Sequence, residues 1–152
     1  MRKLAPQEVR TFFVTSVTWG RRSLFQTDRM AGLFIKVLSS AREQVLLHEW
    51  VLMPNHFHLL ITPKPDISLE RALQRIKGGF SFRAKKELGF SGEIWQPGFT
   101  EHRIQDAADY DVHRRYILEN PGRARLSDSY PYVSTSGVIE LDEPPPGLKP
   151  NP

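Results

Sequence analysis

Two histidines, His56 and His58, lie in the middle of an apolar run that reads LHEWVLMPNHFHLLITP. Residues i and i+2 of a β-strand project from the same face, so the two imidazoles would lie side by side, at a spacing suited to chelating one cation. Phe57 and Leu59 would face the other way, toward a hydrophobic core. Taken alone, the pair is also compatible with two partly exposed histidines on an open sheet face.

A tyrosine and an asparagine could meet these histidines from a helix. Tyr116 and Asn120 are four residues apart and therefore share one helical face. If that helix crossed the open face of the sheet, the Asn120 amide oxygen would complete a two-imidazole, one-amide site suited to Mg²⁺ or Mn²⁺. Tyr116 would lie one turn away, where a nucleophile that attacks phosphorus belongs. Alternatively, Tyr116 anchors the helix and Asn120 caps its end before Pro121.

The hydrophobic pattern predicts the elements that must position these residues. Strands are expected at 11–19, 45–53, 56–62 and 101–105. Three helices are expected to begin after the N-cap residues Thr27, Ser68 and Asp106. In the second helix Gly78-Gly79 interrupts the pattern, and the segment beyond it either resumes a helix or forms a basic loop. Asn120-Pro121 is expected to end the third helix.

This order of elements predicts an α+β fold. It matches a ferredoxin-like βαββαβ arrangement, in which an antiparallel sheet carries helices on one face, with an additional C-terminal helix carrying the tyrosine. The chain has 152 residues, which fits one compact domain over residues 1–138. Residues 139–152 form a proline-rich tail that we expect to be disordered or extended.

The composition excludes several classes of function. The chain has no cysteine, which excludes disulfides, zinc ribbons and thiol chemistry. No apolar run approaches ~18 residues, and the start MRKLAPQEVRTFF lacks the apolar core of a signal peptide, so we expect a cytoplasmic protein.

Positive charge is in excess and clustered. The formal net charge is +4, and the segment from Glu140 onward is acidic, so the rest of the chain is more basic still. Between residues 71 and 86 six basic residues occur without an acid. This pattern favours a polyanionic partner, and its alternative is a solvated helix face.

Four segments together carry a resemblance to a known family. They read MPNHFHLLI, KGGFSFRAKKELGFSGEIWQPGFTEHRI, YILENPGRARL and DSYPYVSTS. In this order and spacing they resemble the HUH-type tyrosine transposases that act on single-stranded DNA, in particular the branch associated with repetitive extragenic palindromes (the REP-associated, IS200-like transposases). The resemblance runs from about residue 11 to about residue 136.

The resemblance implies a set of roles for individual residues. It implies a divalent metal, Mg²⁺ or Mn²⁺, held by His56 and His58, with Asn120 at the position of the third ligand and Tyr116 as nucleophile. Related branches carry a glutamine at that third position. The implied reaction is cleavage and rejoining of single-stranded, hairpin-containing DNA through a 5′-phosphotyrosine intermediate. Some relatives exchange the tyrosine helix between two subunits and others act alone, so both a monomer and a homodimer are compatible with the family.

Several further residues are secondary candidates. Basic side chains that could contact phosphate are Lys77, Arg83, Lys85, Lys86 and Arg103. Trp95 could stack on an unpaired base or belong to the core. His113, one turn before Tyr116, could assist proton transfer or be a packing residue.

Two functions from different classes therefore follow from the sequence. The first is a DNA-cleaving and strand-transferring enzyme. The second is a non-catalytic binder of hairpin DNA or RNA on the same fold. Retention of both histidines and the tyrosine favours the enzyme.

Overall fold

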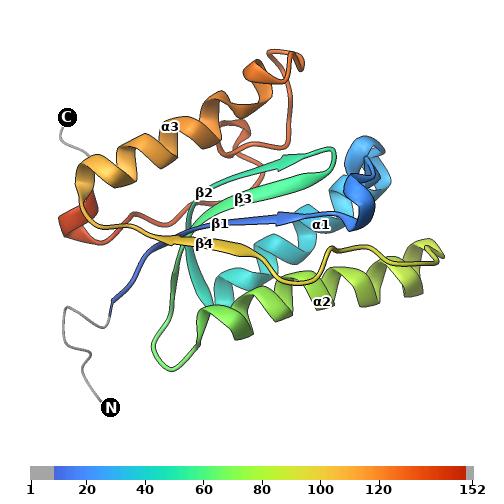
Figure 1. The fold of residues 1–152 in the computed structure, drawn as a ribbon, viewed down its shortest axis with the longest axis horizontal. Helices are drawn as coiled ribbons and strands as arrows, with labels where there is room; N and C mark the ends of the chain where they lie inside the picture. The colour runs from blue at the N-terminus through green and yellow to red at the C-terminus, as the bar shows by residue number, and fades with distance from the viewer. Residues whose placement is uncertain (1–8, 150–152) are drawn as a thin grey trace.

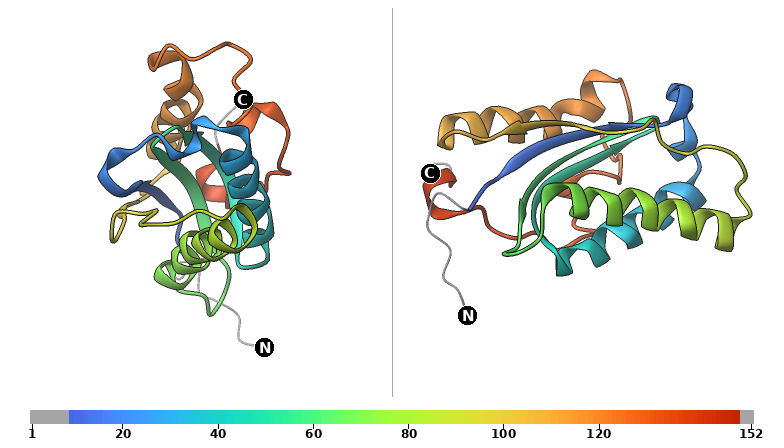
Figure 2. Two further views of the ribbon diagram at one scale, coloured as in Figure 1. Left: turned by 90° about the vertical axis from the view of Figure 1, so that its right-hand side faces the viewer. Right: turned by 60° about the horizontal axis from the view of Figure 1, so that its bottom comes forward.

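A four-stranded antiparallel sheet separates two helices on one face from a third helix on the other (Figures 1 and 2). The computed structural model describes residues 9–149. The strands are β1 Phe12–Val17, β2 Val45–Met53, β3 His56–Pro63 and β4 Thr100–Arg103. The longer helices are α1 Asp28–Ser40, α2 Leu69–Leu88 and α3 Ala107–Arg123. Short 3₁₀ helices cover Trp19–Arg21, Leu24–Gln26, Ala41–Glu43, Ser134–Ser136 and Pro146–Leu148.

The strand order is β2-β3-β1-β4, which confirms the ferredoxin-like α+β prediction. β2 and β3 form the expected hairpin around Pro54 and Asn55. Because side chains alternate along β3, Phe57 and Leu59 enter the core beneath α1 and α2, whereas Leu60 enters a second apolar cluster beneath α3. The sheet thus has two buried faces, and the face of α3 is the one that carries the histidines.

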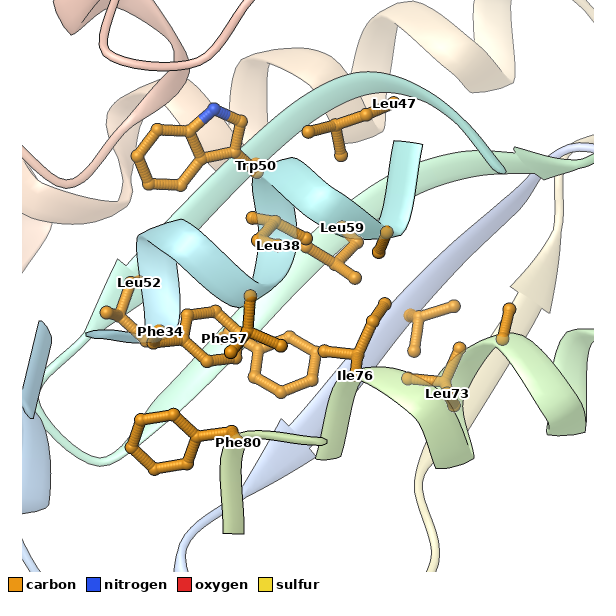
Figure 3. Packing of buried hydrophobic residues seen from close by; sticks show 14 of the residues in the cluster. Phe34, Leu38, Leu47, Trp50, Leu52, Phe57, Leu59, Leu73, Ile76 and Phe80 are labelled. Carbon is orange, nitrogen blue, oxygen red and sulfur yellow. The ribbon is translucent and has the colours of Figure 1, made fainter. Parts of the chain in front are cut away.

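The main core lies between the sheet and the α1–α2 layer (Figure 3). The rings of Phe34 from α1 and Phe57 from β3 have centroids 5.1 Å apart, and Phe80 from α2 lies 5.7 Å from Phe34. Helix α1 begins after Thr27 as predicted, because the Thr27 hydroxyl accepts a hydrogen bond from the Met30 N–H at 3.4 Å.

Helix α2 continues through Gly78-Gly79, so the alternative of a basic loop after these glycines is wrong. Its buried stripe runs on through Ile76, Phe80 and Ala84, and packing of this stripe overrides the low helix propensity of glycine. The helix ends at Leu88, and its C-cap Gly89 has a left-handed φ of 66°. Although α2 is the longest helix, neither it nor any other helix within residues 9–149 is long and apolar enough to cross a membrane.

Helix α3 extends beyond the end that the sequence predicts. It includes Pro121 and ends at Arg123, with Ala124 as its C-cap, so the expected end at Asn120-Pro121 is wrong. Proline disfavours but does not forbid a helical residue before it, and in the last turn its missing N–H removes only one hydrogen bond. Asn120 and Pro121 are both buried, and that packing stabilises the additional turn.

The segment after α3 crosses the molecule and lies along the outer edge of β2. The backbone N–H of Leu52 donates to the Tyr132 carbonyl at 2.9 Å. The backbone N–H of Trp50 donates to the Ser134 hydroxyl at 2.6 Å. Ile139 is buried in the main core, and Asp142 exchanges backbone and side-chain hydrogen bonds with Leu47.

Residues 139–149 therefore lie against the body of the protein, which fits the extended alternative for the proline-rich tail. Polar groups on the edge of β2 provide binding partners that a composition argument cannot detect. Residues 150–152 of that tail lie outside the described residues.

Candidate active site

His56 and His58 lie side by side on the face of the sheet that α3 covers. Their ring centroids are 4.8 Å apart. His58 is 5% exposed, and His56 at the start of β3 is half-buried. The strand alternation expected from the sequence therefore brings the two imidazoles together.

One nitrogen of each imidazole is already engaged by a neighbouring side chain. Nδ1 of His58 lies 2.7 Å from the hydroxyl of Thr15, the residue opposite it on β1, and Nδ1 of His56 lies 2.7 Å from Oδ1 of Asn55. Nε2 of His58 is buried and has no hydrogen-bond partner among the described residues. An imidazole that is held through Nδ1 and has a free Nε2 suits metal binding, because the hydrogen bond at Nδ1 fixes the ring orientation.

Burial keeps both imidazoles neutral near pH 7. It lowers the pKa of His58 to about 3, with a smaller contribution from the neighbouring His56. Burial also lowers the pKa of His56, and the charge of Arg21 acts in the same direction. A neutral imidazole has a lone pair to offer, so the electrostatics of this pair suit a cation.

Tyr116 projects from α3 onto the histidine pair. Its ring lies edge-on to His58 with centroids 5.2 Å apart, and 38% of its surface is exposed. Phe13 of β1 supports both rings: it stacks on His58 at 5.1 Å and meets Tyr116 at 6.0 Å. The guanidinium of Arg123 lies 5.4 Å from the centroid of the Tyr116 ring. The phenol is thus reachable from solvent, next to the imidazoles and beside a fixed positive charge.

Asn120 lies one turn beyond Tyr116 and is 8% exposed. It continues the buried stripe of α3 that includes Ile117. Its backbone carbonyl accepts the N–H of Ala124 at 3.1 Å. The role of the Asn120 side-chain amide as third metal ligand stays a prediction.

Two of the predicted DNA contacts, Trp95 and Lys77, also make contacts within the fold. Trp95 is 9% exposed, packs on Phe25 and Phe57, and donates its indole N–H to the Lys77 carbonyl at 2.9 Å. The core alternative is thus the one that fits Trp95, and stacking on a base is not supported. The Lys77 ammonium donates a hydrogen bond to the carbonyl of Gln96 at 3.2 Å, and burial lowers the pKa of Lys77.

The remaining basic candidates lie away from Tyr116. Arg83, Lys85 and Lys86 belong to α2, in the layer on the opposite face of the sheet (Figure 2). Arg83 is paired with Glu87, and Arg103 lies on the exposed edge strand β4. The sheet therefore separates the α2 residues from the histidine pair, and the contact of all these basic residues with DNA stays a prediction.

Three features of this face are missing from the sequence analysis. Thr15 and Phe13 reach the site through strand register, which leaves no local signal. His102, Asp109 and His113 form the third feature: one ligand atom from each lies within 4.8 Å of the other two, and the group could hold a metal ion. The i, i+4 spacing of Asp109 and His113 is the signal that could have found it.

Matches to known proteins show the family of the chain. The family model described as "Transposase IS200 like" matches residues 11–120, and the chain belongs to this family. Over 123 residues the chain is 29% identical to a REP-associated tyrosine transposase of Escherichia coli (strain K12), covering 75% of this chain and 72% of the relative. A solved structure of a REP-associated tyrosine transposase bound to a REP hairpin aligns with a TM-score of 0.66 and 27% identity. It covers 95% of this chain and 92% of the relative.

Proposed function

We propose that the protein cleaves and rejoins single-stranded, hairpin-containing DNA, with Tyr116 as the nucleophile. The proposal depends above all on the contact between the rings of Tyr116 and His58 within one chain. Membership of the IS200-like transposase family supports the reaction class, and the relative bound to a REP hairpin supports the substrate class.

The donor set fits a divalent cation. His56 and His58 would bind it through Nε2, since their Nδ1 atoms are engaged, and the Asn120 amide oxygen would be the third ligand. Because the site combines imidazole and amide donors and has no thiolate, Mg²⁺ or Mn²⁺ suits it. When bound, the ion would polarise the scissile phosphate and offset the charge that develops on its oxygens.

The chain itself supplies the nucleophile and its position. The Tyr116 oxygen attacks phosphorus, a new ester bond to tyrosine forms, and the bond to the 3′-oxygen breaks. The phenolic proton leaves to solvent and the departing 3′-oxygen takes up a proton, which yields a 5′-phosphotyrosine and a free 3′-hydroxyl. One phosphodiester replaces another, so a 3′-hydroxyl can reverse the step without ATP.

Phe13 and Arg123 would support this chemistry. Phe13 packs on both His58 and Tyr116, so it holds the phenol in register with the histidine pair. The Arg123 guanidinium is close to the Tyr116 ring and would attract the phosphate that the phenol attacks.

A covalent-adduct assay tests the proposal. The protein is incubated with Mg²⁺ or Mn²⁺ and a labelled single-stranded oligonucleotide containing a hairpin with flanking sequence, and the products are separated under denaturing conditions. We expect a protein–DNA adduct that Tyr116→Phe abolishes and that chelator prevents. Tyr132→Phe, which alters a tyrosine near Asp28 and away from the histidines, should retain the adduct. Hairpin binding without an adduct in either metal would instead support the non-catalytic binder of DNA or RNA.

A further inference from the structure

The strongest unassigned feature is the group formed by His102 of β4 with Asp109 and His113 of α3. Nε2 of His102 lies 2.8 Å from Oδ2 of Asp109, and Nδ1 of His113 lies 3.2 Å from Oδ1 of the same carboxylate. Side-chain exposures are 46%, 20% and 21% in chain order, so an ion and its water can reach the group.

We propose that His102, Asp109 and His113 form a second metal site, selective for Zn²⁺ or a similar transition ion, that ties the edge strand β4 to the helix carrying Tyr116. The existence of this site does not depend on the proposed DNA chemistry, because it uses none of the residues assigned to that reaction.

The spacing of the three donors suits such an ion. Nitrogen and oxygen ligands about 2.0–2.2 Å from a tetrahedral zinc lie roughly 3.3 Å from each other. The His–Asp separations of 2.8 Å and 3.2 Å are near this value, and all three donor atoms lie within 4.8 Å of one another. Two imidazoles and one carboxylate leave a fourth position for water and carry a single negative charge, which suits a divalent cation.

The surroundings orient two of the ligands. The Gln105 N–H donates to Oδ2 of Asp109 at 2.9 Å, the kind of outer contact that orients a ligating carboxylate. The rings of His102 and His113 stack with centroids 4.7 Å apart. The Phe13 ring packs on the His113 ring, with centroids 4.8 Å apart. Nδ1 of His113 also donates to the Asp109 carbonyl at 2.8 Å, and the ion would replace that proton.

The site differs from the histidine pair in position. Phe13 lies between them, because its ring contacts His58 as well as His113. Two imidazoles and one carboxylate are a ligand set that zinc sites use, so the group suits a transition ion. A bound ion would connect β4, all of whose residues are exposed, to the turn of α3 that precedes Tyr116.

The test separates the two sites by removing the histidine pair. In the full chain carrying His56→Ala and His58→Ala, the remaining histidines are His102, His113 and the buried His48. After chelator treatment and dialysis, this double variant is titrated with Zn²⁺ by calorimetry and with Co²⁺ by visible absorption. We expect one equivalent of Zn²⁺ to bind and an excess of Mg²⁺ not to displace it.

Substitutions in the double variant identify the ligands. Adding His102→Ala or Asp109→Asn should weaken zinc binding at least tenfold, whereas Asp111→Asn, which alters a nearby acid paired with Arg114, should not. Zinc at about 100 times its dissociation constant should raise the midpoint of thermal unfolding by roughly 5–10 °C, and His102→Ala should abolish this shift.

Either of two results would overturn the proposal. One is a double variant that circular dichroism shows to be folded and that binds no Zn²⁺. The other is zinc binding that persists unchanged in both His102→Ala and Asp109→Asn. Neither result bears on the adduct assay, which uses the unaltered histidine pair, so failure of the second site and failure of the proposed DNA reaction are distinguishable.

Discussion

Thr15 shows how one side chain outside the histidine motif controls the site. Its hydroxyl holds Nδ1 of His58 at 2.7 Å and so orients the imidazole whose Nε2 is left free. Hydrogen-bonding partners of metal-binding histidines typically contribute about 10–100-fold to affinity or activity. This places Thr15 among the positioning residues of the proposed reaction.

We therefore expect Thr15→Val to reduce adduct formation about 10–100-fold while the fold persists, since valine keeps the shape of threonine on a strand. Adduct yield against Mn²⁺ concentration is the measurement, and loss of orientation should raise the metal requirement. Thr100→Val is the matched control, because Thr100 lies opposite Thr15 on β4 and is exposed. Equal yields for wild type and Thr15→Val would show that the hydroxyl does not orient the site.

At this scale the sequence predicts which motif residues share a face better than it predicts the contacts that support them. The placement of His56 and His58 on one face follows from strand periodicity alone. The contacts of Thr15 and Phe13 with His58 depend on which residues β1 places opposite β3, and a register between distant strands leaves no local pattern. The sequence is compatible with Trp95 either stacking on a base or packing in the core, and the 9% exposure of Trp95 fits the core.

Among the elements, α2 is where local propensity and packing disagree. Gly78 lies inside the helix, and a Cβ at that position would meet nothing within 4 Å. Glycine at this position raises the backbone entropy of the unfolded chain. No close contact in the folded state requires a glycine there.

Gly78→Ala should therefore stabilise the protein by about 0.5–1 kcal/mol. Gly89→Ala is the opposite control: the C-cap has φ 66°, a left-handed conformation that alanine adopts at a cost, so this variant should be destabilised. Urea unfolding followed by circular dichroism measures both. A destabilised Gly78→Ala would mean that the glycine is needed for a contact or a distortion of α2.

Element boundaries show where sequence reasoning reaches its limit. Caps at Thr27, Ser68 and Asp106 are local hydrogen bonds, and all three are present as predicted. The continuation of α2 through its glycines and of α3 through Pro121 depends on tertiary burial. A pattern read one segment at a time does not contain that information.

Over the whole molecule, Asp142 anchors the last described segment to the body. Its carboxylate accepts hydrogen bonds from the Arg42 guanidinium at 2.8 Å and the Leu47 N–H at 2.9 Å. Burial by itself would raise the pKa of Asp142, but the hydrogen bonds from Arg42 and Leu47 outweigh it, and the pKa lies below its ordinary value of 3.8. Because the pKa is lower in the folded state than in the unfolded state, the ionised carboxylate stabilises the fold at pH values above the ordinary pKa. This stabilisation is lost as the pH falls through the folded-state pKa.

Asp142→Asn should accordingly lower the free energy of unfolding by about 1–2 kcal/mol near neutral pH. The difference from wild type should shrink below pH 3.8, where the wild-type carboxyl begins to take up a proton. Urea unfolding at a series of pH values checks both parts, with Glu140→Gln as control because that neighbouring acid is 84% exposed. A difference that is independent of pH would assign the effect to packing and not to charge.

The same anchored segment makes the two borders of the sheet unequal. Outward-facing amides of β2 are already bonded to the chain's own residues, whereas β4 pairs on one side with β1 and, within residues 9–149, with no strand on the other. Lateral growth of the sheet is thus possible in a single direction. Two copies that met along β4 would each cover the β4 border of the other, which is the only free border within residues 9–149, and the assembly would stop at a pair without propagating into a fibre.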